Sequence, residues 1–368
     1  MDKTHLFTPG PVPIEDHLLA IGAKQPPYNR TEAFSDFTHE ILDGLSYLFQ
    51  TEGSVAILTA SGTAAMEASI LNFLDFNDQV LIINGGTFGQ RWCDLCDVHG
   101  ISYDEIEVPY GADLDMAHLS DVLLLNAYTA MLVNAHETSM GHLYDIRSMG
   151  DLAQRHGVFF VVDAISTICA DAFFMDDWHV DVAILSSQKA LALPPGLSFV
   201  AMNQRAINRA DRIKPKSLYL NLADYLANQQ RGQLPYTPAI GLMMQLHQRL
   251  LDIRQETLSL SIARHQRRAD SFRKAMEDLV FDILPARSSN ALTALWCKDL
   301  DAFEVVRELA EEHHIVVASS GGEMKSKVFR VAHMGAQEDE GVECLVEALR
   351  NISTSAMPSH NQTESMTI

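Results

Sequence analysis

Short apolar runs alternate with turns of small residues and amphipathic helical stretches between residue 51 and about residue 200. The runs occupy residues 54–60, 79–85, 130–136, 158–164 and 181–187. Their almost continuous apolar character is typical of strands that are buried on both faces. The pattern therefore predicts an α/β fold in which helices sandwich a mostly parallel sheet. Ligands of such sheets collect beyond the carboxyl ends of the strands, so the residues that follow each run are candidates for the site.

The chain has 368 residues, which is enough for more than one domain, because single hydrophobic cores stop growing at roughly 250–300 residues. A long helical stretch over about 239–276 precedes further strand and helix patterns, which predict a smaller C-terminal α+β domain. We expect an N-terminal arm over 1–16, a large domain over 17–240, a connecting helix and small domain over 241–352, and a disordered tail over 353–368. The arm is rich in proline and the tail is polar.

The net charge of −21 disfavours nucleic acid and anionic membrane surfaces as partners. No apolar run reaches the roughly 18–20 residues that a membrane helix requires. Five scattered cysteines and the lack of an apolar leader predict a reducing, cytoplasmic location. Cys93 and Cys96 form a CDLC pair, but a second pair of ligands at suitable spacing is missing, so we expect no metal site.

Two charged residues stand at the ends of apolar runs. Lys189 lies between the run at 181–187 and a Pro-Pro-Gly turn, and Asp163 closes the sequence VVD. Either charge is costly to bury unless it has a partner. A lysine that snorkels to the surface and an aspartate that caps a turn are the alternatives to a functional site. The sheet model brings both residues to one edge.

A third signal is the sequence SGT that follows the first apolar run. Ser61, Gly62 and Thr63 fall where a helix begins, so free backbone N–H groups and the helix dipole favour an anion there. A plain helix cap is the alternative. One ligand uses an amine, a carboxylate and a helix N-terminus together, namely pyridoxal 5′-phosphate (PLP), through its aldehyde, ring nitrogen and phosphate.

An ordered set of motifs extends this hypothesis to most of the chain. The sequence resembles the class V, fold-type I PLP-dependent aminotransferases, and is most similar to their alanine/serine–glyoxylate aminotransferase group. The matching stretches are FTPGPVP near the N-terminus, LTASGTAAMEA (58–68), NGGTFGQRW (84–92), NAHETSMGHLYD (134–145), VVDAIS (161–166), SSQKALALPPG (186–196), YTPAI (236–240) and KSKVFRVAHMG (325–335). The resemblance implies the fold-type I architecture, with a mostly parallel sheet and a smaller C-terminal α+β domain.

The resemblance also implies roles for individual residues toward the cofactor. Lys189 would form an imine with the PLP aldehyde and later move a proton, and Asp163 would contact the pyridine nitrogen. The remaining implied cofactor contacts stack on the two ring faces, approach the ring hydroxyl or hold the phosphate. These contacts are Phe88 and Ile165 for the faces, Thr138 for the hydroxyl, and Ser61, Gly62, Thr63 and Gln188 for the phosphate.

Substrate and assembly follow from the resemblance in the same way. Arg330 would hold the α-carboxylate of the substrate with its two-pronged guanidinium. Thr237 would reach the phosphate in the neighbouring subunit, which implies a homodimer with shared active sites. Family members often carry His-Arg-Ser in the N-terminal segment, whereas this chain has Asn29-Arg30-Thr31, with Arg30 as a candidate substrate contact.

The sequence favours transfer of an amino group from a small donor of the alanine or serine type to a 2-oxo acid such as glyoxylate or pyruvate. The alternatives are a transaminase of the 2-aminoethylphosphonate–pyruvate type, a ureidoglycine–glyoxylate aminotransferase, a PLP-dependent lyase on the same fold, and a non-catalytic binding protein. A cysteine desulfurase is disfavoured, because Gln188 and Phe88 stand where that branch has histidines and residues 311–335 contain no cysteine.

Overall fold

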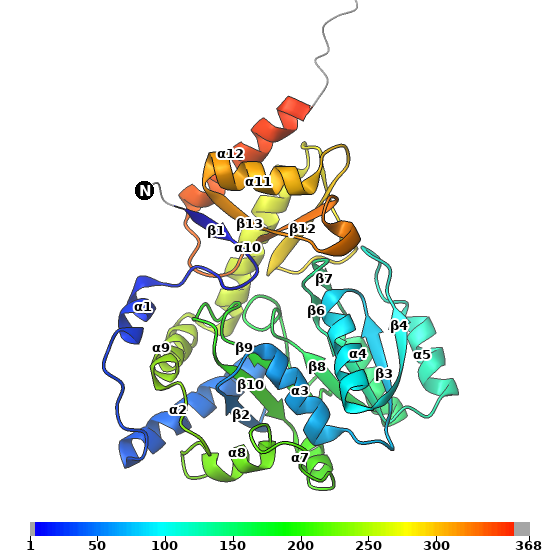
Figure 1. The fold of residues 1–368 in the computed structure, drawn as a ribbon, viewed down its shortest axis with the longest axis vertical. Coiled ribbons are helices and arrows are strands. Elements are labelled where there is room, and N and C mark those ends of the chain that lie inside the picture. Colours follow the sequence, from blue (N-terminus) through cyan, green and yellow to red (C-terminus); the bar gives the residue numbers. More distant parts are fainter. Residues whose placement is uncertain (1–3, 357–368) are drawn as a thin grey trace, which may run out of the picture.

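The computed structural model describes residues 4–356, with side chains to residue 355. Its larger sheet has seven strands in the order β2-β10-β9-β8-β5-β3-β4 (Figure 1). The strands are β2(Ser54–Leu58), β3(Gln79–Asn84), β4(Ser102–Glu107), β5(Ala130–Asn134), β8(Phe159–Asp163), β9(Val182–Ser186) and β10(Ser198–Met202). Five of them coincide with the apolar runs of the sequence, which confirms the predicted α/β sheet.

Strand pairing is parallel except around β10. β3 pairs in parallel with β4 and β5, β5 with β8, and β8 with β9, whereas β10 is antiparallel to both β2 and β9. Ser198 lies opposite both Leu58 and Ser186. The carboxyl ends of β2 and β9 therefore reach the same edge of the sheet, where the predicted site residues follow.

Helices cover both faces of this sheet. Successive residues of one strand, such as Leu132 and Val133 of β5, belong to two different apolar clusters. Helices α3, α4, α7 and α8 contribute to one cluster, and α2, α5, α6 and α9 contribute to the other. The helices are α1(Asp16–Gly22), α2(Glu32–Phe49), α3(Gly62–Phe73), α4(Thr87–His99), α5(Met116–Leu125), α6(Ile146–His156), α7(Gln204–Ala210), α8(Leu222–Gln229), α9(Ile240–Glu256), α10(Leu258–Met276), α11(Ala302–His313) and α12(Asp339–Ala356). Burial on both faces explains why the strands lack polar alternation.

A second sheet has the strand order β1-β13-β14-β12-β11 and lies beside α10, α11 and α12 (Figure 1). Its strands are β1(His5–Phe7), β11(Phe281–Ile283), β12(Leu292–Cys297), β13(Ile315–Ser319) and β14(Val328–Ala332). The N-terminal arm contributes β1, which pairs in parallel with β13. A separate apolar cluster, with residues such as Phe272 and Phe329, packs this sheet against its helices. This is the smaller C-terminal α+β unit that the sequence predicts, while the residue boundaries given for the domains stay a prediction.

Two boundaries differ from the sequence analysis. The predicted helical stretch at 239–276 is two helices, because Thr257 adopts a φ of 76° and its hydroxyl accepts a hydrogen bond from Leu260 N (3.4 Å). The expected tail at 353–368 begins too early, since α12 continues to Ala356 with Ile352 and Ser353 buried. Residues 357–368 lie outside the described part of the chain.

The remaining elements are short. β6(His136–Glu137) and β7(His142–Leu143) form a two-stranded ribbon, and a 3₁₀ turn spans Gly322–Met324. Across residues 4–356, no helix combines the length and the apolar character of a membrane-crossing segment.

Candidate active site

Asp163 is the last residue of β8, and Lys189 follows the neighbouring parallel strand β9. Both are buried, with 6% and 9% of their surface exposed. The Asp163 carboxylate accepts a hydrogen bond from Ile165 N (2.9 Å) and another from Asn134 Nδ2 (2.8 Å). Asn134 is the last residue of β5 and lies opposite Asp163 in the sheet register. The carboxylate is thus fixed in orientation by the strand on one side and by the following turn on the other.

The two charges act on each other's pKa. Burial raises the pKa of Asp163 to about 6, and burial lowers the pKa of Lys189 to about 8, while the attraction between the two groups opposes both shifts. The positive charges of Arg330 and Arg91 contribute to this lowering of the Lys189 pKa. With a pKa of about 8, about a tenth of the Lys189 amines are neutral at pH 7, against fewer than about one in a thousand for an ordinary lysine. The site therefore supplies a nucleophilic amine near neutral pH.

Phe88 lies beside the lysine, and Ile165 packs against the start of α3. The Lys189 Nζ atom lies 5.9 Å from the centroid of the Phe88 ring, in the first turn of α4. The Glu137 carboxylate fixes this turn by accepting hydrogen bonds from Phe88 N (3.3 Å) and Gly89 N (2.9 Å). Ile165 packs so closely against Gly62 that a Cβ at residue 62 would lie 2.5 Å from Ile165 Cδ1. The absence of a side chain at residue 62 therefore makes room for Ile165.

The start of α3 lies at the same edge of the sheet. Ser61 precedes this helix in an extended conformation, and its side chain makes no capping hydrogen bond, which disfavours the plain helix cap. Arg91 Nη1 donates to Thr63 Oγ1 (3.2 Å), and the Arg91 guanidinium lies 4.9 Å from the centroid of the Phe88 ring. An anion at this helix start would meet backbone N–H groups, hydroxyl groups and a guanidinium.

Gln188 lies beside the helix start through Ser186, whose hydroxyl donates to Gln188 Oε1. The methylene of Ser186 in turn lies 3.3 Å from the Cβ position of Gly62. The predicted phosphate residues of α3 and of the β9 loop therefore adjoin one another.

Arg330 reaches the site from β14 of the second sheet. Its Nη1 donates to the carbonyl oxygen of Thr138 (3.1 Å), and its Nη2 donates to the carbonyl oxygen of Ser319 (2.7 Å). The Arg330 Nε atom is buried and has no hydrogen-bond partner among the described residues. Burial lowers the pKa of the Arg330 guanidinium, and the attraction of Glu137 opposes this shift. The structure thus joins the predicted substrate residue Arg330 to the predicted ring residue Thr138.

The N-terminal arm covers the lysine, a feature that the sequence analysis missed. Gly10 has a φ of +146°, and a Cβ built there would lie 3.1 Å from the Gln188 carbonyl oxygen and 3.2 Å from Lys189 Cδ. Few L side chains adopt this backbone conformation or fit such a space. The Pro-Gly-Pro sequence marked a turn, but nothing in it indicated which side chain the turn would cover.

Two predicted residues are not joined to this cluster by any contact in the described part of the chain. The Arg30 guanidinium donates to Gln233 Oε1 and to the Leu234 carbonyl oxygen, both at 3.1 Å. Thr237 is exposed on the segment before α9, next to Tyr236. The predicted roles of Arg30 and Thr237 therefore stay predictions.

The two cysteines of the CDLC sequence lie on α4. The Cys93 thiol donates to Glu105 Oε2 (3.4 Å), and burial raises the pKa values of Cys93 and Cys96 to about 12. At neutral pH both side chains are therefore thiols rather than thiolates. Within residues 4–356, no group of three or more His, Cys, Asp or Glu side chains is placed to hold a metal ion.

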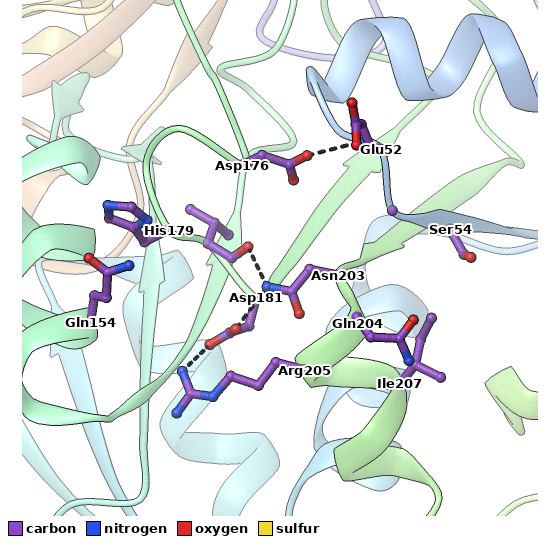
Figure 2. A pocket seen from close by; sticks show the side chains of 12 residues that line it. Glu52, Ser54, Gln154, Asp176, His179, Asp181, Asn203, Gln204, Arg205 and Ile207 are labelled. Atoms are coloured by element: carbon purple, nitrogen blue, oxygen red, sulfur yellow. Dashed lines mark hydrogen bonds and ion pairs between the residues drawn. The ribbon is translucent and has the colours of Figure 1, made fainter.

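A separate polar pocket of about 480 Å³ lies at the opposite end of β9 (Figure 2). Its buried carboxylate, Asp181, accepts hydrogen bonds from Phe160 N (2.8 Å), Asn203 Nδ2 (2.9 Å) and Arg205 Nη1 (2.9 Å). Figure 2 shows the side chains of Asn203 and Arg205 directed at Asp181. Protein groups therefore satisfy the hydrogen-bonding capacity of this carboxylate.

The first cluster fits a phosphorylated pyridine aldehyde. Lys189 offers an amine with a lowered pKa, and Asp163 offers a fixed carboxylate. The uncapped Ser61 hydroxyl is a polar group that a bound anion would satisfy. Amine, carboxylate and helix start are the three groups that PLP requires.

Comparisons with known proteins agree with this chemistry. The chain matches the family model described as Aminotransferase class-V over residues 27–341. A soluble hydrogenase small subunit from a Synechococcus species is 32% identical over 95% of this chain and 93% of its own length. A serine–glyoxylate aminotransferase from Arabidopsis thaliana is 30% identical over 90% of this chain and 86% of its own length. The solved structure of an alanine–glyoxylate aminotransferase from a Nostoc species has a TM-score of 0.90 at 30% identity and covers 96% of each chain.

The chain belongs to the class V aminotransferase family. It is accordingly a PLP-dependent aminotransferase of fold type I. The relatives bear different names, one of a hydrogenase subunit and two of aminotransferases, so the choice of substrates has to be argued from the site.

The lowered pKa of Lys189 predicts the pH dependence of cofactor capture. Raising the pH through about 8 converts the ammonium to the neutral amine, which alone attacks an aldehyde. Mixing apoprotein with PLP should therefore give a rate of visible absorbance change that rises with pH and levels off above about pH 8. The Lys189→Ala protein is the control and should not show this absorbance change. A rate that still climbs at pH 10 would contradict the shift.

The contact between the arm and the lysine predicts the effect of Gly10→Ala. The added methyl group would crowd Gln188 and Lys189 and strain the backbone at φ +146°. We expect about tenfold weaker PLP binding, measured by equilibrium dialysis, because overpacking of this kind costs about 1–3 kcal/mol. Gly241→Ala in α9 is the matched control, since a Cβ there meets no atom within 4 Å. Equal affinity of Gly10→Ala and the wild type would disprove the arm's role.

Proposed function

We propose that this aminotransferase moves an amino group from a small donor of the alanine or serine type to a 2-oxo acid such as glyoxylate or pyruvate. The observation that carries the proposal is the buried pair of Asp163 and Lys189, with the Arg330 guanidinium entering the same site. Relatives described as serine–glyoxylate and alanine–glyoxylate aminotransferases support the choice of substrates.

When bound, PLP supplies an aldehyde that carries the amino group and a ring that accepts electrons from the reacting carbon. Lys189 would hold the aldehyde end of PLP, and its amine would take up and return a proton at the substrate carbon. The Asp163 carboxylate, fixed by Asn134, would stabilise a positive charge on the ring nitrogen. Phe88 and Ile165 would hold the ring and exclude water from it.

Arg330 binds the α-carboxylate of the donor and of the acceptor. Its Nη atoms are anchored by two carbonyl oxygens, so the guanidinium is held in one orientation before substrate arrives. Each Nη atom also carries a second N–H, which remains for a carboxylate oxygen. A phosphonate donor would call for additional cations, but no contact among the described residues joins Arg30, the candidate cation, to this cluster. The proposed donor therefore has its α-carboxylate as its only anionic group.

A homodimer with shared active sites is part of the proposal. Leu218 is 79% exposed and Tyr219 is 41% exposed, and the Tyr219 ring stacks on Tyr236 with a centroid distance of 5.1 Å. Thr237 follows directly and is exposed as well. An exposed apolar patch of this kind is typical of an interaction surface.

We place the enzyme in the cytoplasm, in keeping with its five free cysteines.

The function is tested by mixing the PLP-bound protein with single amino donors and following the loss of visible absorbance. Alanine or serine should bleach the cofactor band, and glyoxylate or pyruvate should restore it. Release of ammonia without restoration would instead indicate a lyase. No change with any α-amino acid would contradict the proposal.

Arg330→Ala should raise the half-saturating donor concentration by about tenfold or more, because a charge-assisted hydrogen bond to the carboxylate is lost. PLP binding should be retained. Arg307→Ala is the matched control, since Arg307 is an exposed arginine of α11 that pairs with Glu304. An unchanged half-saturating concentration in a folded Arg330→Ala protein would exclude Arg330 from carboxylate binding.

Mixed dimers test the shared site. A Lys189→Ala chain and a Thr237→Ala chain, each with low activity alone, should regain about a quarter of wild-type activity when refolded together. Half of the dimers are then mixed, and each mixed dimer has one complete site of two. No gain in activity on mixing would place Thr237 in its own subunit's site.

A further inference from the structure

His136 is a buried histidine near the predicted ring residue Thr138, and the proposed function gives it no role. His136 is 2% exposed, and its Nδ1 atom lies 3.0 Å from Ser166 Oγ. Ser166 Oγ lies 2.7 Å from Thr138 Oγ1. The His136 Nε2 atom is buried and has no hydrogen-bond partner among residues 4–356. One imidazole and two hydroxyl groups thus form a short chain that ends at Thr138.

His136 is neutral throughout the physiological range. Burial, together with the positive charges of Lys189 and Arg330 and with nearby His142, lowers the pKa of His136 to about 3. A neutral imidazole carries a single ring proton, so only one of its two nitrogens can donate. The direction of the chain therefore depends on which nitrogen holds the proton.

The buried position of Nε2 decides which of the two tautomers of neutral His136 is present. A proton on Nε2 would leave a buried N–H without a protein acceptor, next to positively charged groups. A proton on Nδ1 has an acceptor in Ser166 Oγ and leaves only a bare lone pair at Nε2. Orphaned buried N–H groups are the rarer of the two in proteins. The proton therefore belongs on Nδ1.

We propose that His136 directs the hydrogen bonds from its Nδ1 through Ser166 to Thr138, so that the Thr138 hydroxyl presents its hydrogen to the cofactor. When Nδ1 donates, Ser166 Oγ accepts this hydrogen bond and in turn donates a hydrogen bond to Thr138 Oγ1. The other acceptor near these hydroxyl groups is the His136 carbonyl oxygen, which lies 3.5 Å from Thr138 Oγ1 and 3.4 Å from Ser166 Oγ, both longer than the 2.7 Å between the two hydroxyl oxygens. The Thr138 hydrogen can therefore turn from this long contact to a nearer acceptor on the cofactor. Arg330 holds the Thr138 carbonyl oxygen, so this residue is fixed in place.

The inference rests on the proposed function and on the place that the family resemblance implies for Thr138, beside the ring hydroxyl oxygen of PLP. That oxygen carries negative charge in the bound cofactor, so a donor stabilises it and an acceptor does not. His136 is thus a positioning residue that acts through Ser166. Its replacement by leucine would let the Ser166 hydroxyl turn to the backbone carbonyl oxygen of residue 136, which lies 3.4 Å away. Thr138 would then donate to Ser166 and withdraw its hydrogen from the cofactor.

The experiment compares holoenzyme with His136→Leu and His136→Asn. The asparagine side-chain nitrogen can take the place of Nδ1 and donate to Ser166, whereas leucine cannot donate. The leucine variant should bind PLP about three- to tenfold more weakly, the size of one net hydrogen bond. The visible absorbance of the holoenzyme is measured against pH, and the midpoint of its change should lie at a higher pH in the leucine variant. A ring oxygen that has lost the Thr138 donor holds the neighbouring proton more tightly. The asparagine variant should stay near the wild type in both measurements.

His265→Leu is the matched control. His265 is also buried, also has a lowered pKa and also has an unpartnered Nε2, but its Nδ1 contacts the Ser261 carbonyl oxygen within α10. This variant should change stability without moving the absorbance midpoint. A His136→Leu protein with wild-type affinity and midpoint would overturn the relay, as would an asparagine variant that behaves like leucine.

A second readout does not need the cofactor. The ¹⁵N shifts of the His136 ring in apoprotein, assigned by their loss in His136→Asn, should show the proton on Nδ1. A proton on Nε2 would overturn the inference even if the leucine variant fails to fold. Failure of the wild type to bind PLP or to react with any amino donor would instead refute the proposed function, and the tautomer would still report on the relay.

Discussion

The burial of two opposite charges at the ends of adjacent strands is the constraint on which this site depends. Taking Asp163 and Lys189 out of water is costly, and their mutual attraction repays only part of that cost. Asn134 and the Ile165 N–H stabilise the carboxylate. The remaining cost raises the pKa of Asp163 and lowers the pKa of Lys189, so that both shifts favour the neutral forms. Shifts of this kind are typical of residues in functional sites.

The rest of the fold serves to enclose this pair. The large sheet supplies both charges, the second sheet supplies Arg330, and the N-terminal arm places Gly10 against the lysine. Because β1 of the same arm pairs with β13 of the second sheet, the cover over Lys189 and the strands around Arg330 are connected. Displacement of the second sheet would therefore disturb both the substrate residue and the surroundings of the lysine.

Much of this arrangement could be predicted from the sequence. Continuous apolar runs mark strands buried on both faces, and a charge at the end of such a run stands out because burial makes it costly, so Asp163 and Lys189 could be found. Residues whose importance depends on strand register could not. Asn134 matters because it lies opposite Asp163 on a neighbouring strand, and His136 matters because Ser166 lies within hydrogen-bond distance of its ring. An asparagine after an apolar run was the available signal for the first, and the second had none. The break at Thr257 was missed because the helical periodicity continues across it.

The most direct test of the central claim is to reduce the PLP-bound protein with borohydride and map the labelled peptide. The account predicts that the cofactor is found on Lys189, and that Asp163→Asn protein, when loaded and reduced, carries it on the same residue but holds it more weakly before reduction. A label on any other lysine of the wild-type chain would contradict the account.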